Sequence, residues 1–475
     1  MELFNKIMSG TSDIIWTYIL IAGLIGLGIY FSIRTNFVQF RYIKEMGRLL
    51  TDKNTVSAEG KRGISSFQAF TISTASRVGT GNLAGVATAI AGGGPGAVFW
   101  MWLIALLGGA TSFIESTLAQ IYKVKDGKDG FRGGPAYYME KGLNARWMGI
   151  LFAIIITFCF GLVFNSVQSN TISLAMNEAY SFDRFTIGII LAVLTAVIIF
   201  GGVKRIASVT QIVVPVMAIL YILLALFILI LNVTEIPGMI ALIFENAFGI
   251  REVASGSVGA AIMLGIKRGL FSNEAGMGSA PNAAASAGVT HPAKQGLIQT
   301  LGVFTDTLII CTSTAFIIIL SNEYMGGTDG IQLTQAALTT HVGGWANTFV
   351  AIAIFLFAFS SIIGNYYYGE TNIEFIKYSP VTLFLYRLAV LGMVIFGAMV
   401  DLQVVWDLAD LFMGVMAIIN LIAITLLGRI AIAALKDYRQ QKKEGKDPVF
   451  YSDSIEGLKG IESWDPKPKQ EKKIN

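Results

Sequence analysis

A polar stretch interrupted by glycines decides the fold of this chain: residues 77–82 read Arg-Val-Gly-Thr-Gly-Asn inside a segment with apolar flanks. A second such stretch, residues 267–278, reads Lys-Arg-Gly-Leu-Phe-Ser-Asn-Glu-Ala-Gly-Met-Gly. Closely spaced glycines let the backbone leave helical geometry at low cost. A charge near the middle of a membrane costs on the order of 3 kcal/mol, so these charges must face protein or water. Irregular backbone at that depth persists only where protein lines a cavity, and we therefore expect a functional site at both stretches.

The composition places the chain in a membrane. Of its 475 residues, 54% are hydrophobic and only 14% are charged. A soluble domain carries roughly a quarter charged residues, so a soluble enzyme, a nucleic-acid-binding domain and a disordered scaffold are excluded. We expect neither an enzyme nor a cofactor, because the sequence holds no phosphate-binding lysine loop, no metal-spaced histidine pair and no serine elbow.

Eleven segments are long and apolar enough to cross about 30 Å of hydrocarbon as helices. They are residues 14–33, 64–91, 97–121, 148–178, 185–202, 207–232, 256–284, 295–320, 347–369, 380–402 and 406–434. This pattern predicts an all-α integral membrane protein with about 11 transmembrane helices.

The loops predict the orientation, since the cytoplasmic side of a membrane protein retains an excess of lysine and arginine. Basic residues gather in residues 34–62, in residues 122–147 and at Lys204 and Arg205. Lysine and arginine are missing from residues 92–97, 233–249 and 321–346. We therefore expect a multi-pass membrane protein with its N-terminus outside and its C-terminus in the cytoplasm.

The two interrupted segments are the second and the seventh span, so five crossings separate them and the second unit enters the membrane from the opposite face. This spacing predicts a 5+5 inverted repeat, which is typical of transporters with a central site. The expected units are an extra N-terminal helix and cytoplasmic loop (1–63), the first repeat (64–232), an outer connecting segment (233–251), the second repeat (252–435) and a solvated cytoplasmic tail (436–475). Two glycine-rich spans that merely pack closely are the alternative, which leaves the charges unexplained.

A third stretch resembles a known family. Residues 92–103 read Gly-Gly-Gly-Pro-Gly-Ala-Val-Phe-Trp-Met-Trp-Leu and look like the signature of the alanine/glycine:cation symporters, and residues 77–82 and 268–276 resemble the same family. The resemblance covers essentially the whole chain. It implies a prokaryotic plasma-membrane protein on the leucine-transporter fold that imports small amino acids with sodium or, in some members, protons.

An amino-acid substrate carries two charges that a dry site must satisfy. Its carboxylate suits the free N–H groups at the start of a half-helix, and we assign this role to the amides of Thr80 and Gly81, helped by the Thr80 hydroxyl. Its ammonium needs acceptors, which the carbonyls of Phe271 and Ser272 and the amide oxygen of Asn273 can supply.

The fourth span is expected to provide a third wall of the site. Gln168 is the polar residue nearest its middle and is a candidate hydrogen-bond partner of the substrate, while Phe164 is a candidate cap. An interhelical hydrogen bond for Gln168 and plain packing for Phe164 are the alternatives.

Sodium is a hard cation that prefers several oxygen ligands, and the ninth span offers the adjacent hydroxyls of Ser360 and Ser361. By resemblance to the leucine-transporter fold, these serines and the Phe357 carbonyl would hold a sodium ion against the carbonyls of Ala75 and Val78. Serines can instead bond to their own helix. The ninth span carries no basic side chain that could replace the ion, which favours sodium over proton coupling.

Three further acids in the membrane are expected to form structural ion pairs with the bases of the interrupted spans, and a proton-coupling role for one acid is the alternative. The acids are Glu115, Asp306 and Glu370, and the bases are Arg77, Lys267 and Arg268. The sequence does not say which pairs form.

The sequence therefore predicts a secondary transporter in a lipid bilayer with no nucleic-acid partner, and the family resemblance implies alanine or glycine as the cargo and sodium as the coupling ion. A proton-coupled carrier, a glutamine or serine carrier of the same fold and a passive channel are the alternatives.

Overall fold

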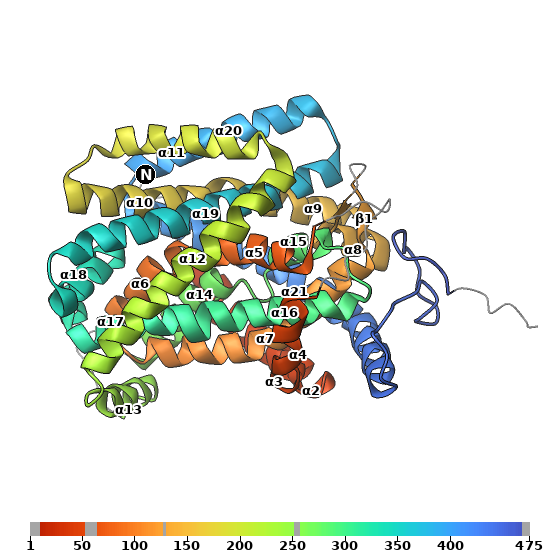
Figure 1. Cartoon of the computed structure of the whole chain (residues 1–475), viewed down its shortest axis with the longest axis horizontal. Helices are drawn as coiled ribbons and strands as arrows, with labels where there is room; N and C mark the ends of the chain where they lie inside the picture. The colour runs from red at the N-terminus through yellow and green to blue at the C-terminus, as the bar shows by residue number, and fades with distance from the viewer. Residues whose placement is uncertain (1–9, 53–63, 127–129, 251–256, 468–475) are drawn as a thin grey trace, which may run out of the picture.

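The computed structural model describes residues 10–52, 64–126, 130–250 and 257–467, and nearly all of its ordered segments are helices (Figure 1). Part of the expected first cytoplasmic loop, residue 251 of the expected connecting segment, and the start of the second repeat lie outside the described residues. So do both ends of the chain.

Within the described residues, eight helices are long and apolar enough to cross a membrane. They are Gly10–Arg34 (η1 Ile15–Leu20 and α2 Ile21–Arg34), α7 (Ala97–Ile121), Arg146–Tyr180 (α9 Arg146–Ile156, η3 Thr157–Phe164 and α10 Asn165–Tyr180), α12 (Gly202–Leu231), Pro292–Ser321 (α16 Pro292–Phe304, η4 Thr305–Cys311 and α17 Thr312–Ser321), α19 (Trp345–Ile376), α20 (Pro380–Met399) and α21 (Leu402–Lys443). Together with the shorter α11 (Arg184–Ile199) and two interrupted helices, they account for the eleven predicted spans. The predicted all-α membrane fold is confirmed.

Both predicted interruptions are breaks in the backbone. The first lies between α5 (Ser66–Arg77) and the segment formed by η2 (Gly81–Gly85) and α6 (Val86–Gly93). The second lies between α14 (Val258–Asn273) and α15 (Ala280–Ser286). Gly276 and Gly278 adopt φ values of +89° and +83° there, a conformation that glycine adopts without steric cost.

Each interrupted helix begins a set of five predicted spans, and helices of the first set pack against helices of the second. In the first set, α10 packs against α19 and α20 of the second set, and α11 packs against α20. The half-helix α5 of the first set packs against α15 and α19 of the second. This exchange is what a leucine-transporter-like 5+5 inverted repeat produces, with α2 added at the N-terminus.

The short elements gather at two opposite ends of the helix bundle (Figure 1). At one end lie α3 (Val38–Arg41), α4 (Ile43–Leu50), the hairpin of β1 (Val124–Lys125) and β2 (Phe131–Arg132), α8 (Pro135–Leu143) and the C-terminal tail. At the other end lie α13 (Ile236–Ala247), η5 (Glu323–Gly326) and α18 (Gly330–Val342). The end with the tail carries the basic loops, which the charge pattern predicts to be cytoplasmic, and we refer to it as the inner face.

The tail differs from the solvated segment that the sequence predicts. Phe450 is only 2% exposed, and its ring lies 5.2 Å from the ring of Trp464 and 5.4 Å from that of His291. The balance of charges in the tail suggests solvation, but two aromatic side chains supply enough apolar area to hold it against the protein.

Candidate functional site

The first break frees backbone carbonyls that an intact helix would use. In a continuous helix the N–H of Gly79 would donate to the carbonyl of Ala75. In this chain the Gly79 N–H donates to the side-chain oxygen of Asn82 at 2.9 Å instead. Val78 ends α5 in an extended conformation, with φ −83° and ψ 92°. The carbonyls of Ala75 and Val78 are therefore available to another partner.

These carbonyls meet the hydroxyl that the sequence predicts. Ser361 Oγ on α19 lies 2.8 Å from the Ala75 oxygen, 3.3 Å from the Val78 oxygen and 3.1 Å from the Phe357 oxygen. Ser360 Oγ also lies 2.8 Å from the Phe357 oxygen. The five residues of the predicted ion site thus come together, and all their contacting atoms are uncharged oxygens.

The second break is held open by a carboxylate from a neighbouring helix. Glu115 on α7 accepts hydrogen bonds from the N–H groups of Gly276 and Gly278, both at 3.1 Å, and from the Asn420 side chain at 2.8 Å. Asn420, on α21, also donates to the Gly276 carbonyl at 2.9 Å. These contacts replace hydrogen bonds that the backbone loses where it unwinds.

The two breaks touch each other at Gly81. A β-carbon at this position would lie 3.0 Å from the Phe271 ring and 3.1 Å from the Ser272 α-carbon. Only glycine lets the backbones approach this closely. The predicted carboxylate and ammonium sites are therefore adjacent, as a small zwitterion requires.

Aromatic rings cover this junction. The ring of Phe271 lies 4.5 Å from that of Phe164 and 4.8 Å from that of Trp406. All three residues are less than 5% exposed. Sequence reasoning found Phe164 and Phe271 but missed Trp406, which comes from the last span and lies in a stretch with no local signal of a site.

Gln168 reaches the start of the first break. Its side-chain oxygen accepts a hydrogen bond from the Thr80 N–H at 2.9 Å. An acceptor oxygen thus occupies the position that the sequence predicts for the substrate carboxylate. The Thr80 hydroxyl is buried and has no hydrogen-bond partner among the described residues, so a donor remains there for a ligand.

Asn273 lies at the second break, but its side chain is turned differently from the prediction. The amide oxygen, expected to face an ammonium, accepts a hydrogen bond from the Ala275 N–H at 3.0 Å. The amide nitrogen is the buried atom without a partner among the described residues. The Asn273 amide oxygen is used within the turn because the N–H groups of the unwound backbone need hydrogen-bond acceptors.

The bases of the second break pair with an acid that sequence reasoning missed. Arg268 Nη2 lies 2.7 Å from Asp410 Oδ2, and Lys267 Nζ lies 3.7 Å from the same oxygen. The expectation that Glu115, Asp306 or Glu370 would pair with these bases is wrong, because α21 brings Asp410 to α14.

The expected acids have other partners. Glu370 pairs with Arg387 at 3.3 Å. Asp306 accepts hydrogen bonds from the Asn82 side chain at 2.6 Å and from the Ser272 hydroxyl at 2.8 Å, so one carboxylate links both breaks. Arg77 donates to the carbonyl of Gln299 at 3.2 Å, and its charge interacts electrostatically with Glu115 and Asp306, as expected.

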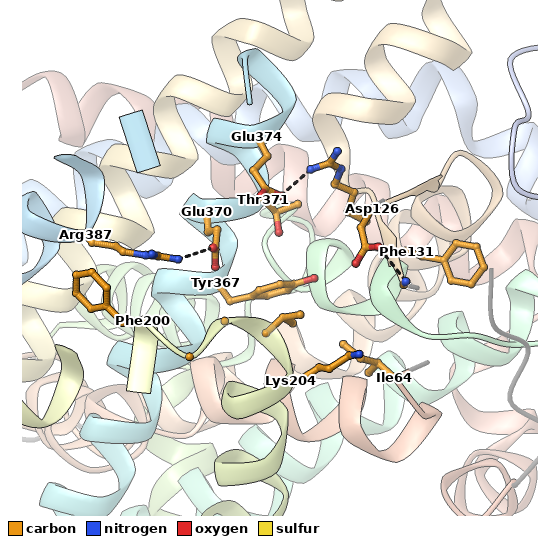
Figure 2. A pocket seen from close by; sticks show the side chains of 15 residues that line it. Ile64, Asp126, Phe131, Phe200, Lys204, Tyr367, Glu370, Thr371, Glu374 and Arg387 are labelled. Atoms are coloured by element: carbon orange, nitrogen blue, oxygen red, sulfur yellow. Dashed lines mark hydrogen bonds and ion pairs between the residues drawn. The ribbon is translucent and has the colours of Figure 1, made fainter. Parts of the chain in front are cut away.

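A cavity of about 370 Å³ opens at the inner face, and we refer to it as the inner vestibule (Figure 2). It is lined by three acids and three bases, namely Asp126, Glu370, Glu374, Arg132, Lys204 and Arg387. Two ion pairs cross its wall, between Arg132 and Glu374 at 2.7 Å and between Arg387 and Glu370. The cavity includes none of the predicted site residues.

A tight helix contact separates the inner vestibule from the central site. A β-carbon on Gly364 of α19 would lie 2.9 Å from the Ser76 nitrogen of α5. Next to it, the Ser76 hydroxyl lies 2.6 Å from both Asn365 Oδ1 and Glu274 Oε1. Along α19, the residues therefore run from the ion site, through this contact, to Tyr367 and Thr371 in the vestibule wall.

Comparison with known proteins gives one consistent result. The sequence model of the sodium:alanine symporter family matches residues 1–452. "Amino-acid carrier protein AlsT" of Bacillus subtilis (strain 168) is 61% identical over 464 residues, which cover 98% of each chain. "Probable sodium/glutamine symporter GlnT" of the same organism is 58% identical, over 98% of this chain and 96% of the relative.

More distant proteins are also similar. "Sodium/alanine symporter AgcS" of Methanococcus maripaludis is 37% identical over 94% of this chain and 99% of the relative. Among solved structures, a manganese transporter of Eremococcus coleocola matches with a TM-score of 0.47 and 14% identity, over 79% of this chain and 88% of that chain.

Proposed function

Because this chain belongs to the sodium:alanine symporter family, we propose that it imports a small neutral amino acid, alanine or glycine, together with sodium. The family and the relatives are transporters, so the chain is a multi-pass membrane transporter of an amino acid and a cation and not an enzyme.

The observation that carries sodium coupling is the set of oxygens around Ser361. The hydroxyls of Ser360 and Ser361 lie within hydrogen-bonding distance of backbone carbonyls from Ala75, Val78 and Phe357. None of these groups is titratable. Neutral oxygens suit a hard monovalent cation. A proton would need a basic or acidic atom in the same place, so this arrangement favours sodium over proton coupling.

The substrate lies beside this ion in the proposal. Its carboxylate takes the Thr80 amide and hydroxyl, displacing the oxygen of Gln168, and also the Gly81 amide. Its ammonium faces the carbonyls of Phe271 and Ser272. The close approach of Gly81 to Ser272 leaves little room for a side chain, which supports alanine or glycine as the cargo.

Glutamine or serine is the second candidate cargo. The relative with 58% identity is named a probable sodium/glutamine symporter, so a larger polar substrate is compatible with much of this sequence. Phe164 and Trp406 would have to separate to admit a longer side chain.

Transport requires the site to open to each face in turn. We propose that residues 64–232 and 252–435 form the two repeats whose relative movement opens it, and that the N-terminus lies outside and the C-terminus in the cytoplasm of a prokaryotic plasma membrane. One sodium ion moving with a neutral zwitterion carries one charge, which contributes about 2.3 kcal/mol per 100 mV. That energy supports a roughly 50-fold substrate gradient before any sodium gradient is added.

Uptake by the purified protein in liposomes tests the proposal. We expect accumulation of labelled alanine with an inward sodium gradient, and none when potassium replaces sodium. Competition by a panel of L- and D-amino acids then ranks the cargoes. Uptake that is equal in the two salts would contradict sodium coupling, and stronger competition by glutamine than by alanine would reassign the cargo.

A further inference from the structure

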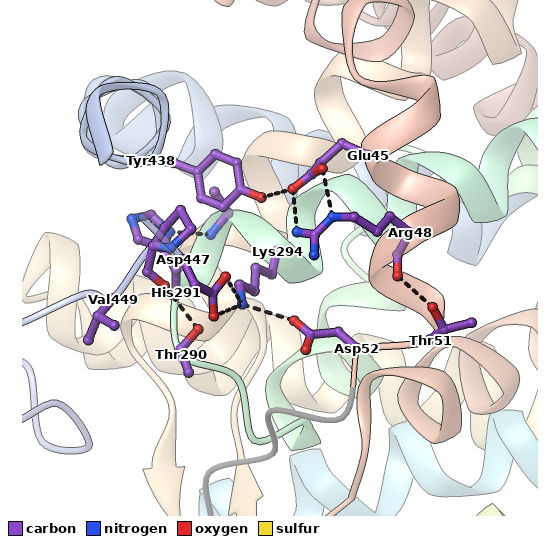
Figure 3. A network of polar contacts seen from close by, with 12 residues as sticks. Glu45, Arg48, Thr51, Asp52, Thr290, His291, Lys294, Tyr438, Asp447 and Val449 are labelled. Carbon is purple, nitrogen blue, oxygen red and sulfur yellow. Dashed lines mark hydrogen bonds and ion pairs between the residues drawn. The ribbon is translucent and has the colours of Figure 1, made fainter. Parts of the chain in front are cut away.

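The C-terminal segment 447–465 folds back onto the inner face after α21. Gln441, near the end of α21, holds the turn, since its side-chain oxygen accepts from the Val449 N–H at 2.9 Å and its side-chain nitrogen donates to the Val449 carbonyl at 2.8 Å. Figure 3 shows this region, with Val449 beside Thr290 and His291. The segment therefore has a defined position on the protein.

The segment first contacts the loop between α15 and α16. The Phe450 N–H donates to the Thr290 carbonyl at 2.8 Å, and the Thr290 hydroxyl donates to the Pro448 carbonyl at 2.9 Å. This loop leads out of the inner half-helix of the second break. The tail is thus bonded through its backbone to a part of the chain that begins at the central site.

Ion pairs also attach the tail to the start of α16 (Figure 3). Lys294, at the start of α16, is 1% exposed, and its ammonium lies 3.0 Å from Asp447 of the tail and 2.9 Å from Asp52, which follows α4. A buried ammonium costs much free energy unless acids surround it. Asp447 therefore joins the tail to α16 through an ion pair whose lysine is buried.

Trp464 closes over a second buried lysine. Its ring lies 4.8 Å from the ammonium of Lys123, whose other side faces Phe131 at 4.0 Å, and its indole N–H donates to the Gln120 carbonyl at 3.0 Å. Lys123 in turn donates to the Ala287 carbonyl at 3.1 Å. Ala287 is the C-cap of α15, so the tail covers a hydrogen bond between the end of this half-helix and a residue just after α7.

The residues that the tail contacts also contact the start of the first interrupted helix. Ile64, just before α5, forms a parallel bridge with Ala287, and the Gly288 N–H donates to the Ile64 carbonyl at 3.0 Å. Ile64 also lines the inner vestibule. The inner ends of both interrupted helices therefore meet at the place where the tail is fastened.

We propose that segment 447–465 is a latch that holds the inner half-helices α5 and α15 together and so slows opening of the central site toward the inner vestibule. This proposal rests on the proposed transport function, because opening toward the inner vestibule would release the transported amino acid. The test measures the opening of the vestibule directly and does not depend on transport activity.

The test uses a single cysteine in the vestibule wall of the full-length chain. Thr371→Cys places a thiol at a position that is 2% exposed, while the native Cys159 and Cys311 are buried and give little background. Inverted vesicles are treated with a membrane-impermeant maleimide, and the labelling rate is measured.

Trp464→Ala removes the cover of Lys123, and Asp447→Asn weakens the second attachment. We expect each to raise the labelling rate at residue 371 roughly five-fold or more. The matched control is Lys459→Ala, an exposed residue of the same segment, which should leave the rate unchanged. Since Asp447 lies at the surface end of its ion pair, Asp447→Asn keeps the test valid if Trp464→Ala does not fold.

Labelling at the parent's rate in both folded variants would overturn the latch. A rise in all three variants would also overturn it, because it would show general loosening of the tail. If sodium-driven uptake is absent while the labelling rates change as expected, the proposed function fails and the latch stands.

Discussion

The hydroxyl oxygen of Ser361 lies 2.8 Å from the carbonyl oxygen of Ala75, although the two residues are 286 positions apart in the sequence. One comes from an intact helix and the other from the last turn before a break. The contact is possible because the break leaves the Ala75 carbonyl without its helical partner. An ion placed here would touch both repeats, which couples its binding to their relative position.

Ser361→Ala removes the central oxygen of this set. We expect the sodium concentration for half-maximal uptake to rise roughly ten-fold, the effect of losing about one polar contact, with the order of preferred amino acids unchanged. Uptake at varied sodium measures it. Ser208→Ala is the control, because this exposed hydroxyl on α12 also bonds to its own helix. An unchanged sodium requirement would remove Ser361 from the ion site.

Gly79→Ala places a methyl group between the predicted sodium site and the predicted amino-acid site. The added carbon would lie 2.2 Å from Ser361 Oγ and 2.7 Å from Gln168 Oε1. Overpacking of this kind typically costs 1–3 kcal/mol, so we expect binding of both sodium and alanine to weaken on the order of ten-fold or more. Gly26→Ala serves as the control, since nothing lies within 4 Å of that position. Normal binding by the Gly79 variant would mean that the two sites are not adjacent.

Glu115→Gln tests how the second break is maintained. Glutamine offers one acceptor oxygen where the carboxylate offers two, so one of the Gly276 and Gly278 N–H groups loses its partner. We expect the free energy of unfolding to fall by about 1–3 kcal/mol and the maximal uptake rate to fall with it. Thermal unfolding and uptake are compared with those of Glu235→Gln, an exposed site. Equal stability of the two variants would contradict a structural role for Glu115.

The buried Lys123 makes stability depend on pH. Burial lowers the pKa of this ammonium from 10.5 to about 7. Between these values the unfolded chain binds the proton more tightly, so the free energy of unfolding should rise with pH by about 1.4 kcal/mol per unit above pH 7. In Lys123→Met this increment should be missing. Unfolding temperatures from pH 7 to 9 measure the difference, and parallel curves would show that the lysine is charged throughout.

Local chemistry explains what the sequence predicts well. The two breaks follow from glycines and polar residues that lie next to each other, and the spans follow from continuous apolar runs, so neither needs knowledge of distant contacts. The meeting of Ser361 with Ala75 and Val78 was expected only through the resemblance of the two segments to a known fold. The family match to residues 1–452 confirms the resemblance of the chain to the symporter family.

Long-range packing explains what the sequence does not predict. Arg268 pairs with Asp410 across 142 positions, and Trp406 reaches Phe271 from the last span. The direction of the Asn273 side chain depends on one N–H of its own turn. The attachment of the tail depends on the positions of Phe450 and Trp464, which follow a helix of 42 residues.

We propose that sodium and the amino acid bind at adjoining positions of one broken helix. Calorimetry on the purified protein tests it directly, as the affinity for alanine in sodium and in potassium. We predict binding about ten-fold or more tighter in sodium, with the same factor gained by sodium when alanine is present, because coupling between two sites is reciprocal. Equal alanine affinity in the two salts would contradict the account.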